Sequence, residues 1–158
     1  MLCVRGGTMT YEYLPDDLVL SVPVIDRDHD KLYYFVEMFR SAIEDNDVPA
    51  LGFIFLALTD YTLFHFNREE TGLRACGYEN IGSHEQEHQI LKERVGQIYE
   101  NLKKSPETFD KEKLYEIESF LKDWLHKHIS ESDMAYKDTL VSSPEAIKAM
   151  ENVQFSET

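Results

Sequence analysis

Apolar residues recur at alternating spacings of three and four along four stretches of the chain, and this pattern constrains the fold most. Such spacing places the apolar side chains on one face of an α-helix. We expect helices over about 26–44, 49–76, 81–103 and 110–140. Four amphipathic helices of this length with short connections predict an all-α fold, an antiparallel up-down four-helix bundle that occupies residues 25–140.

The segment before the bundle has a different pattern. Residues 1–24 contain Pro15 and Pro23, which interrupt a regular helix. We therefore expect an extended N-terminal arm, with residues 1–8 disordered. Met9 is an alternative start, so the residues before it are either an unstructured leader or the result of an upstream start.

The predicted helix ends carry capping signals. Ser143 and Pro144 combine an N-cap residue with a proline at the first helical position, which predicts a short C-terminal helix to about Glu151 within residues 141–158. Ser83 and Gln86 have the spacing of a capping box near the start of the third helix.

Histidines and carboxylates occupy positions on the apolar faces where aliphatic side chains belong. A pair four residues apart lies about 40° apart around a helix, so both members can point at one spot in the bundle interior. The inward polar set is His29, His65, Glu69, His84, His88, His128 and Asp133. Together, five imidazoles and two carboxylates would lose several kcal/mol through desolvation without a cation, so the sequence predicts a metal site.

The size of this set indicates two metal ions. Seven donors exceed the six of an octahedral ion, but they fit two ions bridged by both carboxylates and one solvent-derived oxygen, with one position left open. His128 and Asp133 are five residues apart, about 140° around an ideal helix. We therefore expect Asp133 to reach sideways as a bridge, helped by a widened turn. Iron, zinc, manganese and copper all suit these ligands.

Composition excludes several classes of partner. The formal charge of −14 repels nucleic acid and anionic membrane surfaces. We expect no apolar run as long as a membrane span and no signal peptide. Cys3 and Cys76 are too few for a disulfide framework, which favours a reducing cytoplasm. The sequence therefore predicts a cytoplasmic protein without nucleic-acid binding or membrane insertion.

The motifs resemble those of the hemerythrin family, most of all the single-domain bacterial hemerythrins, over about residues 13–140. The resemblance is carried by His29, His65-Phe66-x-x-Glu69-Glu70, Gly77-Tyr78 ahead of His84-x3-His88, and Trp124-Leu125-x-x-His128-Ile129-x3-Asp133. Departures from the common bacterial pattern are Asp28 in place of Gln, Leu73 in place of Met and Glu79 in place of Pro, with Tyr11 or Tyr13 in place of an early Trp. None of these is an expected ligand.

The resemblance implies a non-haem di-iron centre, bridged by carboxylates and an oxo or hydroxo group, that binds O2 reversibly. It places His84, His88 and His128 on the coordinatively full iron. It places His29 and His65 on the iron that takes O2, with Glu69 and Asp133 as bridges. It also assigns the apolar wall of the O2 pocket to Phe66, Trp124, Leu125 and Ile129.

The expected function is oxygen storage, delivery or sensing by an oxygen-binding protein that is not an enzyme. The alternatives are a di-iron enzyme acting on peroxide or nitric oxide, and a metal store or sensor. Besides O2, any partner is expected to be a separate oxygen-using enzyme or signalling protein, and the chain itself a monomer or weak oligomer.

Three neighbouring groups have less specific interpretations. His126 is expected on the surface, and Glu70 in solvent or beside a ligand. Glu85-x-x-His88 matches a motif of ferritin-like bundles, but a second copy is lacking.

Overall fold

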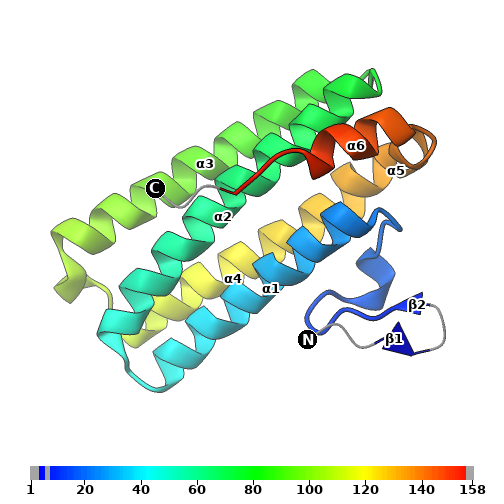
Figure 1. Ribbon diagram of the computed structural model, residues 1–158. Helices are drawn as coiled ribbons and strands as arrows, with labels where there is room; N and C mark the ends of the chain where they lie inside the picture. Colours follow the sequence, from blue (N-terminus) through cyan, green and yellow to red (C-terminus); the bar gives the residue numbers. More distant parts are fainter. Residues whose placement is uncertain (1–3, 6–7, 156–158) are drawn as a thin grey trace.

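The computed structural model describes residues 4–5 and 8–155, and its main body is an antiparallel bundle of four long helices (Figure 1). The helices are α1 (Pro23–Glu44), α2 (Val48–Ala75), α3 (Ile81–Lys104) and α4 (Lys111–His128). The predicted all-α bundle is confirmed. Both ends of α2 and of α3 lie within one residue of the predicted positions, and so does the start of α4.

The fourth helix changes its pitch before it ends. A π-helical turn over Ile129–Asp133 connects α4 to α5 (Met134–Val141), and the helical path is continuous through all three segments. After a short turn, α6 (Pro144–Glu151) packs back against α2 (Figure 1). The Ser143 hydroxyl accepts a hydrogen bond from the backbone nitrogen of Ala146, so the predicted N-cap of the last helix is confirmed.

The predicted start of the first helix, about Asp26, was wrong by three residues. Pro23 is the first residue of α1, a position where its missing N–H and fixed φ are tolerated. The capping box was also wrong. The N-cap of α3 is Asn80, which makes no side-chain cap bond, and Ser83 is the third residue of the helix.

The N-terminal arm is tied to α1 by two carboxylates. Asp26 accepts a hydrogen bond from the backbone nitrogen of Leu20 at 2.7 Å, and Asp30 accepts from those of Tyr13 and Leu14 at 2.7 and 2.9 Å. A 3-10 turn, η1 (Asp16–Leu18), interrupts the arm.

The first residues of the arm include a minimal hairpin. Strand β1 (Val4–Arg5) pairs antiparallel with β2 (Thr8–Met9). The disorder predicted for residues 1–8 falls partly on residues 1–3 and 6–7, which lie outside the described residues.

Helix α2 is more apolar than we predicted. Within the described residues it is long and apolar enough to cross a membrane by length and composition, with a mean hydropathy of 1.4 over 18 residues, 22% of them buried. Phe53, Leu56 and Leu63 are exposed on its outer face, while α1, α3 and α6 pack on its other sides. A single helix of this kind is weak evidence for a span, because core helices of soluble proteins pass the same test.

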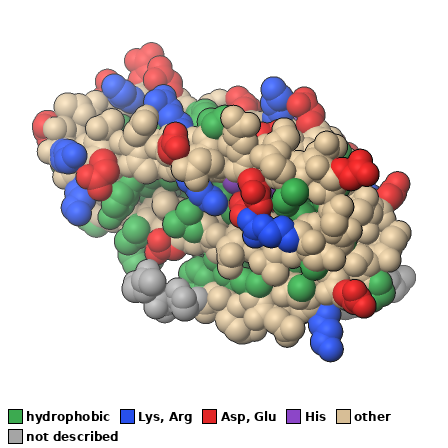
Figure 2. Space-filling model, turned by 90° about the horizontal axis from the view of Figure 1, so that it is seen from above, with side chains coloured by type: hydrophobic (Ala, Val, Ile, Leu, Met, Phe, Trp, Pro, Cys, Tyr) green, Lys and Arg blue, Asp and Glu red, His purple; other side chains and the backbone are tan. Residues whose placement is uncertain are grey.

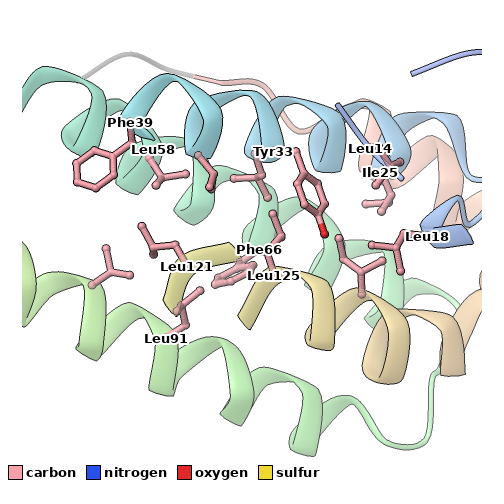
Figure 3. Close-up of a cluster of buried hydrophobic side chains, with 14 of the residues drawn as sticks. Leu14, Leu18, Ile25, Tyr33, Phe39, Leu58, Phe66, Leu91, Leu121 and Leu125 are labelled. Carbon is pink, nitrogen blue, oxygen red and sulfur yellow. The ribbon is translucent and has the colours of Figure 1, made fainter. Parts of the chain in front are cut away.

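The core fills the bundle along its length with apolar side chains from all four helices. Figure 3 shows side chains such as Phe39, Leu58, Leu91 and Leu121 pointing into the space between the helices. The predicted ligands belong to one end of the bundle, where α1 and α3 begin and α2 and α4 end. On the face shown in Figure 2 almost no histidine surface is visible, in agreement with the burial of five of the six histidines.

Candidate metal centre

The seven predicted ligand side chains converge at that end of the bundle and are buried. Their exposed fractions are between 0% and 4%. All four long helices contribute, because each ligand occupies an inward position in the three-four pattern of its helix. The remaining histidine, His126, is exposed, as predicted.

The ligand atoms form two sets that share one carboxylate. The first set is Glu69, His84, His88 and His128, and the second is His29, His65 and Glu69, with the atoms of each set within 4.8 Å of one another. Asp133 also lies between the sets, with one carboxylate oxygen 3.2 Å from His29 Nε2 and the other 3.1 Å from His128 Nε2. Glu69 and Asp133 therefore occupy the positions that bridging ligands require.

The π-helical turn brings Asp133 into this position. In an α-helix, a residue five positions after His128 lies about 140° away around the axis. A π-helix instead places residues five apart on nearly the same side. The predicted widened turn is confirmed, and it is the local structure that allows His128 and Asp133 to face one centre.

The imidazoles of His88 and His128 face each other at the centre through their Nε2 atoms. His88 Nδ1 lies 2.9 Å from Glu70, and His128 Nδ1 lies 2.9 Å from Glu87. A carboxylate accepts hydrogen bonds, so each Nδ1 carries the proton, and each Nε2 of a neutral ring then keeps a lone pair. These two Nε2 atoms are only 3.0 Å apart. Two facing lone pairs at this distance repel each other unless a proton or a metal ion lies between them.

Several buried polar atoms at the centre lack hydrogen-bond partners among the described residues. An unpaired buried polar atom costs about 1–3 kcal/mol. These atoms are Nδ1 and Nε2 of His29, Nε2 of His84, Oε2 of Glu69 and both carboxylate oxygens of Asp133. A cation would satisfy the lone pairs that converge there. The residues present therefore fit a metal bound by imidazole and carboxylate.

The electrostatics of the centre favour any positive charge. Burial lowers the pKa of His128, but the carboxylates of Asp133, Glu69 and Glu87 outweigh burial and raise this pKa to about 9. The same balance raises the pKa values of His65 and His84. Conversely, burial raises the pKa values of Glu69 and Asp133, but the imidazoles around them lower both. Without a metal the centre retains protons, which a metal ion must displace.

Outer carboxylates orient three of the histidines. Each accepts from, or faces, the Nδ1 atom of one ring, which fixes the tautomer that presents Nε2 to the centre. The pairs are Asp28 with His65, Glu70 with His88, and Glu87 with His128. Sequence reasoning placed Glu70 in solvent or beside a ligand and missed Asp28 and Glu87. All three acids directly precede or follow a predicted ligand in the sequence, and this adjacency could have identified them as candidates.

Tyr136 is a further residue whose role the sequence did not indicate. Its buried hydroxyl donates a hydrogen bond to Glu69 Oε1, while Glu69 Oε2 faces His84 and His88. Burial, together with the charges of Asp133 and Glu69, raises the pKa of Tyr136 well above its ordinary value. The hydroxyl therefore remains protonated and acts as a donor.

Apolar and aromatic side chains close one side of the centre. Phe66 stacks on His88 with ring centroids 3.6 Å apart, and Trp124 stacks on His128 at 4.5 Å. A cavity of about 30 Å³ is lined by ten residues, among them Phe66, Trp124 and Leu125. Ile129, the fourth predicted wall residue, is fully buried but does not line this cavity.

The ferritin-like interpretation of Glu85-x-x-His88 does not match the structure. Glu85 is 35% exposed and forms an ion pair with Arg74 at the surface. Only His88 of this motif points into the bundle.

Comparison with known proteins agrees with this arrangement. The family described as the hemerythrin HHE cation binding domain matches residues 20–140 of the chain. The chain belongs to the hemerythrin family. This family is known for O2 binding at a non-haem di-iron site, and its members are in general oxygen-binding proteins and not enzymes.

Bacterial hemerythrins are among the most similar relatives. The bacteriohemerythrin of Pseudomonas paraeruginosa (strain DSM 24068 / PA7) is 28% identical over 125 residues, which cover 79% of this chain and 78% of that protein. The bacteriohemerythrin of Clostridium acetobutylicum is 28% identical over 78% of this chain and 96% of its own length. Myohemerythrin-1 of Phascolopsis gouldii is 34% identical over 52% of this chain and 60% of its own length. The predicted likeness to bacterial hemerythrins is confirmed.

Solved structures support the fold. The crystal structure of a wild-type hemerythrin superposes with a TM-score of 0.69 and 23% identity, covering 76% of this chain and 89% of that chain. At this identity the likeness supports the hemerythrin four-helix fold alone.

Proposed function

We propose that this protein binds O2 reversibly at a pair of iron ions. The observation that carries the proposal is the division of the buried ligand atoms into two sets that share Glu69, with Asp133 between them. One ion could not use both sets, whereas two ions joined by two carboxylates would use every donor. Membership of a family that binds non-haem iron supports iron over the other metals that suit these ligands.

The two sets are unequal, and this inequality supports a single binding position. His84, His88 and His128 would hold one ion, and His29 and His65 the other, with both carboxylates shared. The second ion then has one protein ligand fewer, which leaves a position for a small molecule. When bound in the ferrous state, the ion pair supplies the electrons that reversible O2 binding requires.

The chain contributes a dry and aprotic surrounding. Phe66, Trp124 and Leu125 exclude water from the cavity beside the centre, which slows oxidation by solvent and protons. Among the described residues, Thr62 is the one side chain with a hydroxyl that lines the cavity, and this hydroxyl is already bonded to the carbonyl of Leu58. The Tyr136 hydroxyl is bonded to Glu69 and has a raised pKa. Neither of these two hydroxyls is therefore a free proton donor, which favours holding O2 over reducing peroxide or nitric oxide.

The proposal includes a role in oxygen storage, delivery or sensing in the cytoplasm. The small number of cysteines supports a reducing compartment. Delivery or sensing would require a separate oxygen-using enzyme or signalling protein. We propose a monomer or weak oligomer.

Reconstitution with ferrous iron under nitrogen tests the function. We expect two iron ions per chain, and an absorption spectrum that changes in air and returns to the original under nitrogen over repeated cycles. His65→Gln should lower the iron content toward one per chain, because it removes a ligand of the smaller set. His126→Gln is the matched control and should retain two. One ion per chain in the unaltered protein, or a spectrum that does not return under nitrogen, would contradict the proposal.

A further inference from the structure

A buried carboxylate connects His65 to an arginine on the next turn of α2. The side chain of Asp28 is 2% exposed, and its Oδ2 faces His65 Nδ1 at 3.4 Å. Its Oδ1 accepts a hydrogen bond from the Tyr61 hydroxyl at 2.8 Å. Arg68 Nη1 donates to both oxygens, at 2.7 and 2.9 Å. Asp28 is thus shared between a predicted metal ligand and a permanent positive charge.

The C-terminal tail holds the arginine in place and covers it. Arg68 Nη2 donates to the backbone carbonyl of Val153 at 3.1 Å, and the guanidinium lies over the ring of Phe64, 4.2 Å from its centroid. Phe155, also in the tail, packs edge-on against Phe64 with centroids 5.2 Å apart. The Arg68 side chain is only 14% exposed. Charges so shielded from water act on each other more strongly than charges in solvent.

Asp28 differs from the other two outer carboxylates. The side chain of Glu87 is 43% exposed. That of Glu70 is 12% exposed, and it is surrounded by Arg74 and Lys92, which are themselves partly exposed. Asp28 is therefore the most buried of the three, and it acts on a histidine of the smaller ligand set.

A carboxylate that accepts a hydrogen bond from a metal-binding imidazole makes the ring a stronger donor to the metal. A stronger donor stabilises the ferric state relative to the ferrous state. Arg68 opposes this effect, because it draws the charge of Asp28 toward itself. The balance between them determines how strongly His65 donates.

We propose that Asp28, restrained by Arg68, is a positioning residue that holds His65 with its proton on Nδ1 and sets the reduction potential of the iron centre. This inference rests on the proposed function, because it requires iron at His65. In this proposal the Asp28–Arg68 pair adjusts the reduction potential of the iron ion that His65 would hold. O2 affinity and the rate of oxidation to the ferric state would then depend on two residues that do not touch the metal.

Neutral substitutions at the two positions should have opposite effects. In Asp28→Asn the amide oxygen still accepts from His65, but the negative charge is lost, so the midpoint potential should rise and autoxidation should slow roughly tenfold. In Arg68→Gln the carboxylate loses its counter-charge, so the midpoint potential should fall and autoxidation should accelerate. In the double variant the effect of Arg68→Gln should disappear, because Arg68 acts through Asp28. The double variant also remains informative if the single Arg68 variant does not fold, since it leaves no unpaired buried charge.

Potentiometric titration of the iron-loaded protein measures these shifts. Arg40→Gln and Asp45→Asn change exposed groups at the end of α1 opposite to His29 and should leave the potential unchanged. Nitrogen-15 NMR of the zinc-loaded protein supplies a readout without iron chemistry: the unaltered protein should show His65 protonated on Nδ1, and Asp28→Leu should weaken this preference.

The outcomes separate this inference from the proposed function. If the protein does not bind two iron ions or does not bind O2 reversibly, the proposed function fails. If it does both, but the two single substitutions shift the potential in the same direction or not at all, the function stands and the role of the Asp28–Arg68 pair is refuted. A shift in the double variant that equals the sum of the two single shifts would also refute it.

Discussion

Removal of the metal should make the stability of this protein fall steeply between pH 6.5 and pH 9. In the metal-free protein the carboxylates around His128 raise its pKa from 6.5 to about 9. A histidine with a raised pKa in the folded state stabilises the fold below its unfolded pKa, and this contribution is lost as the pH rises through the folded value. The loss for His128 alone corresponds to about 3 kcal/mol, and the raised pKa values of His65 and His84 act in the same direction.

Urea unfolding followed by circular dichroism measures this dependence. The free energy of unfolding of the chelated protein should decrease across pH 6.5, 7.5, 8.5 and 9.5, a large change for a domain whose total stability is of the order of 5–15 kcal/mol. Iron-loaded protein should show little of this decrease, because metal ions replace the protons and carry the compensating charge. The lowered pKa values of Glu69 and Asp133 add stability at any pH above the ordinary values of these carboxyls, and this contribution is lost as the pH falls through their folded values.

Two substitutions of histidines on α4 form a matched pair, one a control and the other a test. The control, His126→Gln, changes an exposed histidine two positions before His128 in the sequence and should leave the pH dependence of stability intact. His128→Gln should make it shallower, because only the contributions of His65 and His84 remain. A chelated protein whose stability is constant from pH 6.5 to 9.5 would refute the reasoning, as would an equal decrease in the iron-loaded protein.

Two further predictions concern packing. Phe66→Ala removes a buried ring stacked on His88, so it should lower the free energy of unfolding by about 3–5 kcal/mol and accelerate autoxidation. Phe53→Ala, at a ring that is 74% exposed, should change the free energy of unfolding by no more than about 0.5 kcal/mol. Gly72→Ala places a Cβ atom 2.5 Å from the sulfur of Met150 on α6, so it should destabilise the protein by about 1–3 kcal/mol. At Gly96 on α3 a Cβ atom meets nothing within 4 Å, so Gly96→Ala should stabilise the protein by up to about 1 kcal/mol. Urea unfolding of each pair checks both, and equal effects within either pair would contradict the assigned packing.

Periodicity made the bundle and the convergence of its ligands predictable. A residue such as His84 or His88 that occupies a core position of an amphipathic helix must point inward wherever the helix packs. The five-residue gap from His128 to Asp133 even predicted the widened turn. The start of α1 was misplaced because Pro23 has two opposite meanings, a helix blocker in the interior and a favoured residue at the first position.

The outer contacts of the centre were not predictable in the same way. Arg68 meets Asp28 from 40 positions away and the carbonyl of Val153 from 85 positions away. Whether such groups meet depends on the rotation and axial offset of α1 against α2 and on the path of the tail after α6. Neither quantity is expressed in the local pattern of residues.

The sequence by itself determined the four helices, the inward direction of the seven donors and the need for positive charge among them. These follow from short-range periodicity and from the desolvation of polar groups, which act within a few turns of one helix. The resemblance to hemerythrins implied that the donors divide into two sets sharing Glu69, and the tertiary structure shows the distances of that division. Only the tertiary structure decided that Asp28, Glu70 and Glu87 each hold one imidazole. The reason is that distances between helices are set by how the whole core packs, and no single segment contains that information.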